Sequence, residues 1–141
     1  MKNSTLLSLF LVMLMSLAVP AYAGLAVIVH PDNQNPLDER QLRNIFLGKS
    51  QVFADGSEAR PLDLAEGSEE RQAFVSKVLR RTESSLNAYW ARMLFSSQGK
   101  PPKELKDASA VKQAVAADPQ AIGYLDAADV DDTVRVLMIV E

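Results

Sequence analysis

The chain has 141 residues, a net charge of −3, one histidine and no cysteine. The absence of cysteine excludes a disulfide framework, a thiolate metal site, a thiol nucleophile and a lipoprotein anchor. The acidic balance argues against nucleic acid and against an anionic membrane surface as partners, because both attract basic proteins.

The first 23 residues have the composition of a secretory signal peptide. Lys2 supplies a basic start, residues 6–19 form an apolar run, and Ala21-Tyr22-Ala23 is an A-x-A cleavage pattern. This run has 14 residues, whereas a membrane-spanning helix needs about 20. We therefore expect cleavage after Ala23, with an uncleaved anchor as the alternative. The expected product is a periplasmic or secreted protein with no membrane insertion.

The predicted mature chain, residues 24–141, is long enough for one domain of ordinary size. Removal of Lys2 with the signal peptide lowers the basic count from 15 to 14 against 18 acidic residues, a net charge of −4. Apolar periodicity and turn residues predict an alternation of strands and helices. The expected elements are a strand over 25–29, a helix over 38–47, a strand over 59–64, helices over 68–81, 85–95 and 109–117, and strands over 121–125 and 133–140. This order favours an α/β domain with a mixed, largely parallel sheet flanked by helices on both faces.

Two polar segments are expected to lie outside these elements. Residues 98–106 contain one glycine, two prolines and three lysines, which is typical of a solvated loop. Residues 126–132 contain four aspartates, and such a cluster invites a calcium site because calcium takes several oxygen ligands. The spacing does not follow the calcium-loop pattern, so a solvated acidic turn is the preferred interpretation.

Residues for catalysis are scarce. His30 is the single histidine, and the sequence contains neither a G-x-S-x-G elbow nor a G-x-x-x-x-G-K-[ST] phosphate loop. Glu69 and Glu70 are adjacent on a predicted helix and diverge by about 100°, so they are poorly placed to share a reacting atom. The sequence therefore predicts a protein that is not an enzyme and has no cofactor.

The Gly67-Ser68 turn is the candidate functional site. A strand is expected to end at Leu64 and a helix to begin at Ser68, which would act as its N-cap. A helix start exposes N–H groups and the positive end of the helix dipole, so it can hold an anion. Glu69 and Glu70 follow directly, and their carboxylates stabilise a helix start but repel an anion.

Several segments carry a resemblance to a known family. They resemble, in the same order, the periplasmic phosphate-binding proteins of ABC transporters, over nearly the whole mature chain. That family has two lobes, and the chain covers about one of them. The resemblance implies one lobe of a type II periplasmic binding protein, and a non-catalytic receptor that closes over phosphate and delivers it to a permease. The matching segments are 27–33, 42–49, Asp55-Gly56, Glu66-Gly67-Ser68 with Phe74, and 121–124.

In this family the turn reads approximately R-x-D/E-G-S-G-T, and the ligand is held by N–H groups at helix starts and by Ser, Thr and Arg side chains. Glu66-Gly67-Ser68 matches that pattern. Leu64 stands where the arginine would be, and Glu69-Glu70 replaces the Gly-Thr pair. Positive charge for an anion would therefore have to come from Arg71, from Arg60 or from a partner. The expected ligand residues are Gly67, Ser68 and Arg71.

Two functions follow from this pattern. The first is an exported protein that resembles the substrate-binding proteins of phosphate ABC transporters and binds phosphate or another small anion weakly if at all. The second is a periplasmic protein-interaction or sensor module that has lost phosphate binding and whose turn is only a capped helix. Its partner would be a periplasmic or membrane protein.

Overall fold

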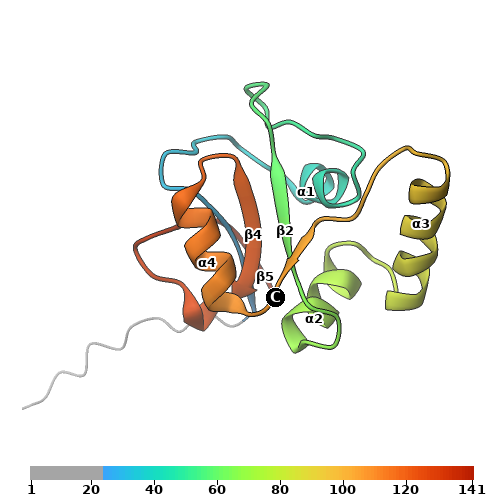
Figure 1. Cartoon of the computed structure of the whole chain (residues 1–141). Helices are drawn as coiled ribbons and strands as arrows, with labels where there is room; N and C mark the ends of the chain where they lie inside the picture. The colour runs from blue at the N-terminus through green and yellow to red at the C-terminus, as the bar shows by residue number, and fades with distance from the viewer. Residues whose placement is uncertain (1–23) are drawn as a thin grey trace, which may run out of the picture.

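The computed structural model describes residues 24–141 (Figure 1). The predicted signal peptide over 1–23 lies outside the described residues. Within 24–141, none of the helices has the length and apolar character that crossing a membrane requires.

Strands and helices alternate through the described residues, as the sequence predicts. The predicted helix over 68–81 is shorter in the structure, and the other shared elements agree within a few residues. In chain order the elements are β1 (Leu25–Val29), α1 (Glu39–Phe46), β2 (Arg60–Leu64), α2 (Glu69–Lys77), α3 (Glu83–Phe95), β3 (Lys103–Leu105), α4 (Ala108–Ala117), β4 (Ala121–Asp126), the short 3-10 helix η1 (Ala127–Asp129) and β5 (Arg135–Val140).

The strands form one sheet in the order β3-β2-β4-β1-β5. β2 pairs in parallel with β3 and with β4, whereas β1 is antiparallel to both β4 and β5. β5 therefore points the same way as β4, and β1 alone opposes the other four strands. This arrangement confirms the predicted mixed, largely parallel sheet. β2, which precedes the Gly67-Ser68 turn, lies beside the edge strand β3.

Helices cover both faces of the sheet. Successive residues of β4 point to opposite faces, so the contacts of Gly123 and Tyr124 show what packs on each face. On one face, a Cβ atom added to Gly123 would lie 2.7 Å from Val111 Cγ1 of α4, so this helix packs directly on the strand backbone. On the other face, the Tyr124 ring stacks on Phe74 of α2 with 3.9 Å between centroids. Phe46 of α1 lies 6.0 Å from the same ring. The apolar core therefore has two layers, with the sheet between them (Figure 1).

Two helix starts differ from the prediction because an upstream side chain caps each helix. α3 begins two residues earlier than expected, since Thr82 Oγ1 accepts a hydrogen bond from the N–H of Ser85 at 3.1 Å. α4 is capped by Asp107, whose carboxylate accepts from the N–H of Ala110 at 2.8 Å. α4 therefore begins at Ala108, one residue before the expected start at 109. Threonine and aspartate are strong N-caps, and both stand immediately before the helices that they begin.

The predicted loop over 98–106 is also wrong in part, because it contains β3. Lys103–Leu105 pairs in parallel with residues 62–64 of β2. Two of the three residues of β3 are charged and exposed, so the sequence has no apolar alternation that would indicate a strand. The strand forms because β2 offers an open edge, and it brings Glu104 beside α2.

Replacing Gly123 by alanine should lower the free energy of unfolding by about 1–3 kcal/mol, because β4 and α4 would have to move apart. Gly99→Ala is a matched control, since its Cβ would meet the flexible methyl end of Met93 at 3.3 Å and the Trp90 ring at an ordinary 4.0 Å. Urea unfolding followed by circular dichroism measures both. Equal midpoints for Gly123→Ala and the unaltered protein would contradict the packing described above.

Candidate functional site

The Gly67-Ser68 turn joins the end of β2 to the start of α2. Gly67 has a φ of +97°, a conformation that favours glycine, although a Cβ there would meet nothing within 4 Å. Ser68 caps α2 as predicted, because its Oγ accepts from the N–H of Arg71 at 3.2 Å. A serine hydroxyl that accepts one bond can still donate its own proton. Ser68 therefore keeps one donor for a ligand.

The first two N–H groups of α2 belong to Glu69 and Glu70. Neither group has a hydrogen-bond acceptor within residues 24–141. Such groups at a helix start are bound by water or by a ligand, and they carry the positive end of the dipole. Gly67 and Glu69 are exposed and Ser68 is half-buried, so solvent reaches the turn. The turn thus offers backbone donors in the geometry that holds anions in other proteins.

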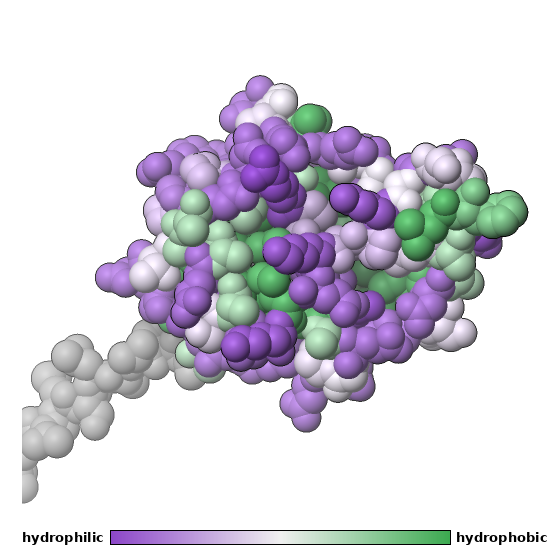
Figure 2. All heavy atoms as spheres, in the orientation of Figure 1, coloured by the Kyte–Doolittle hydropathy of each residue, from purple (hydrophilic) through white to green (hydrophobic). Residues whose placement is uncertain are grey.

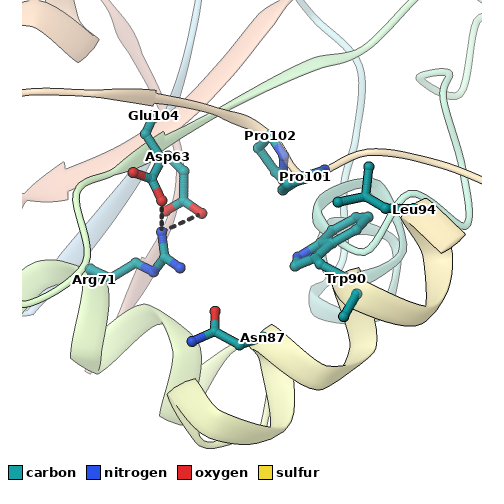
Figure 3. A pocket seen from close by; sticks show the side chains of 9 residues that line it. Asp63, Arg71, Asn87, Trp90, Leu94, Pro101, Pro102 and Glu104 are labelled. Carbon is teal, nitrogen blue, oxygen red and sulfur yellow. Dashed lines mark hydrogen bonds and ion pairs between the residues drawn. The ribbon is translucent and has the colours of Figure 1, made fainter.

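Arg71, expected as a source of positive charge, lies on the buried side of α2 and is 5% exposed. Its Nη1 donates to the Leu64 carbonyl and to Glu104 Oε1, both at 3.0 Å, and lies 3.2 Å from Asp63 Oδ2. Nε and Nη2 donate to the two oxygens of Glu83 at 3.0 and 3.3 Å. Figure 3 shows the guanidinium facing Asp63 and Glu104. Three carboxylates thus balance this charge already, and a ligand contact by Arg71 stays a prediction.

Asp63 and Tyr124 complete the buried network. The Tyr124 hydroxyl donates to Asp63 Oδ1 and accepts from the N–H of Leu64 at 3.3 Å. Burial raises the pKa of Asp63, although the hydrogen bond from Tyr124 and the charge of Arg71 oppose that shift. Burial and the neighbouring Asp63 carboxylate raise the pKa of Tyr124 as well. The phenol therefore remains a donor, which fixes the end of β2 to β4.

The other candidates from the sequence have structural partners. Asp131 lies 2.9 Å from Lys112 Nζ, and hydrogen bonds from Thr133 and Lys112 lower its pKa to about 2. Within residues 24–141, no three acidic or histidine side chains converge as metal ligands. His30 Nδ1 accepts from the N–H of Asp32 at 3.1 Å. Asp131 and His30 thus have structural roles in surface turns.

A cavity of about 250 Å³ opens beside Arg71, between α3 and the edge formed by β2 and β3 (Figure 3). Sequence reasoning missed it. The strand β3, which contributes Glu104, lies in the segment that the sequence predicts as a loop. Leu94, which lines the cavity, is 54% exposed, and only the tertiary structure shows this. The residues that line the cavity are Asp63, Arg71, Asn87, Trp90, Ala91, Leu94, Pro101, Pro102 and Glu104.

A search of solved structures finds phosphate receptors. The chain aligns with an ABC-type phosphate transport receptor from Vibrio cholerae at a TM-score of 0.66 and 22% identity, over 83% of this chain and 46% of that one. The chain therefore shares the fold of about half of this receptor. A putative phosphate ABC transporter substrate-binding protein from Clostridium perfringens, solved with bound phosphate, gives 0.65 and 24%, over 83% and 45%. PstS from Borrelia burgdorferi gives 0.55 and 16%, over 74% and 41%.

The chain therefore spans less than half the length of these receptors. No family model matches the chain, and no curated protein matches it in sequence. At the identities found, the likeness shows the shared fold alone. What the lobe binds has to be argued from its own residues.

Arg71→Met should lower the free energy of unfolding by about 3 kcal/mol, because it leaves the buried Asp63 and the partly buried Glu83 without a counter-charge. Arg60→Met is the matched control, since Arg60 pairs with two carboxylates at the surface and its loss should leave stability close to that of the unaltered protein. Urea unfolding at neutral pH measures both. A loss for Arg71→Met no larger than the control's would contradict the importance of the network.

Proposed function

We propose that this chain is an exported, non-catalytic protein that resembles a solute receptor, with its anion site at the Gly67-Ser68 turn. One observation carries this proposal: the N–H groups of Glu69 and Glu70 are unpaired at an exposed helix start, on a fold shared with phosphate receptors. The Ser68 hydroxyl adds a third donor. Arg71 serves the site by holding the first turn of α2 against β2, β3 and α3.

Phosphate binding at this turn is expected to be weak. No guanidinium stands at Leu64, and the charge of Arg71 is balanced by carboxylates. Glu69 and Glu70 place two negative charges beside the donors, and these repel a dianion. A single lobe also covers the ligand from one side, whereas binding pockets usually bury most of the ligand surface.

Titration of residues 24–141 with inorganic phosphate should give a Kd of about 1 mM or weaker. The measurement is the shift of backbone amide resonances in ¹⁵N spectra, supported by calorimetry. The shifts should centre on Gly67, Ser68, Glu69 and Glu70. The start of α3, capped by Thr82, is the internal control for unspecific binding to a helix end. Equal shifts at both helix starts, or none at high millimolar phosphate, would contradict the proposal.

A second function is favoured by the two glutamates themselves. Carboxylates in the first turn stabilise a free helix start by roughly 0.3–1 kcal/mol each. Glu69 and Glu70 therefore suit a capped helix that never meets an anion. In that case the lobe is an interaction or sensor module, and its partner is a protein.

The double variant Glu69→Gly with Glu70→Thr distinguishes the two functions. If the turn is a receptor site weakened by its own charges, the variant should bind phosphate at least about tenfold more tightly, because two repulsive carboxylates are gone. If the turn is only a capped helix, stability falls and no phosphate binding appears. Thermal unfolding and phosphate titration of the same sample give both readouts. Glu66→Gln, which removes a carboxylate just outside the helix, controls for a general effect of charge.

A further inference from the structure

The last turn of α3 exposes two large apolar side chains. Phe95 is 94% exposed and Leu94 is 54% exposed, although the same helix buries Leu86 and Trp90. In Figure 2 the apolar surface at the right of the view lies over this end of α3. Single exposed apolar residues are common, but two adjacent ones beside a cavity form a contiguous patch. This patch adds nothing to the core, so folding does not explain it.

Leu94 also lines the cavity of about 250 Å³ beside Arg71. Figure 3 shows Trp90, Leu94 and Pro101 on one side of this space, and Glu104 with Arg71 on the other. The cavity thus joins an apolar wall to a charged wall. Pockets for small molecules usually start at about 300 Å³, so this space suits one side chain better than a whole cofactor.

The charged wall carries more negative than positive charge. Among the described residues that line the cavity, Arg71 alone is cationic, and Asp63, Glu83 and Glu104 all pair with it. Glu104 is the accessible member, with 52% of its side chain exposed. Its Oε1 accepts from Arg71, while its Oε2 makes no hydrogen bond within residues 24–141. Lys103 precedes Glu104 in β3 and points to the opposite side of the strand.

The apolar wall and the charged wall of the cavity together determine which kind of group can bind in it. An anionic group would meet the free oxygen of Glu104. A wholly apolar group would remove that carboxylate and the Asn87 amide from water without a hydrogen bond, which is costly. A lysine or arginine satisfies both walls, because its methylene stem can pack on Trp90 and Pro101 while its charged end pairs with Glu104.

We propose that the last turn of α3, Pro101 and this cavity form a docking surface for a protein segment that presents a lysine or arginine between apolar residues. The basic side chain enters the cavity and pairs with Glu104. The flanking apolar side chains cover Leu94 and Phe95. This docking surface is built from α3 and β3, so it does not require that the Gly67-Ser68 turn bind phosphate.

The test uses residues 24–141 and three blocked peptides that differ in one residue: acetyl-Leu-Lys-Leu-amide, its norleucine analogue and its glutamate analogue. Trp90 is the single tryptophan of the chain, so its fluorescence reports directly on the cavity. The lysine peptide should change this fluorescence at millimolar concentration, and the two analogues should not. In ¹⁵N spectra the shifts should map to the end of α3 and to Glu104.

Two variants test the two halves of the docking surface. Glu104→Gln should weaken binding of the lysine peptide about fivefold, as expected for a half-exposed ion pair. Phe95→Ser should weaken it as well without touching the core. Glu66→Gln and Val52→Ser are the matched controls, because Glu66 is exposed and Val52 is 48% exposed away from the cavity. Both controls should bind like the unaltered protein.

Three results would overturn the proposal. The first is no response of Trp90 to the lysine peptide while the fold remains intact. The second is an equal response to the norleucine or glutamate peptide, which would show that Glu104 selects nothing. The third is self-association of the chain that Phe95→Ser abolishes, because a second copy would then be what covers the patch.

Discussion

The ion pairs of the buried Arg71 guanidinium hold together the end of the sheet at which the Gly67-Ser68 turn lies. This guanidinium extends from α2 to the Leu64 carbonyl at the end of β2, to Glu104 of β3 and to Glu83 of α3. One side chain therefore joins four elements, and the Gly67-Ser68 turn lies between two of the joined points. Burying this charge is tolerable only because carboxylates and a carbonyl occupy its donors. The backbone of the turn is therefore held between Leu64 and Arg71, which are joined by a hydrogen bond.

The same ion pairs decide what the turn can offer a ligand. A charge shared among three carboxylates cannot also neutralise an anion, so the helix start depends on backbone N–H groups and the helix dipole. The carboxylates of Glu69 and Glu70 repel an anion that approaches these donors. The charges around the turn thus oppose tight binding of a dianion, although the fold is shared with phosphate receptors. The Arg71 charge that stabilises the turn is therefore not free to pair with an anion.

The sequence predicts those structural features that neighbouring residues in the chain determine. Ser68 is recognisable as a cap from its neighbours, and the apolar run before His30 is recognisable as a strand. The sequence could not predict β3. Lys103 and Glu104 have no strand pattern, and they form a strand only because β2 offers an open edge with which they pair. Nor could it place Arg71, whose partners Glu83 and Glu104 lie 12 and 33 residues away. A basic residue beside a predicted anion site suggests a ligand contact, and only tertiary structure shows that its donors are taken.

The ion pairs of Arg71 contain more negative than positive charge, and this affects the surface around them. One guanidinium needs one counter-charge for neutrality, yet three carboxylates surround it, and Glu104 keeps an oxygen free at the mouth of a cavity. Glu104 is half exposed, so the excess can lie at the solvent side. A second cation can therefore be accommodated there without displacing Arg71, and the exposed Phe95 places apolar contact area beside it.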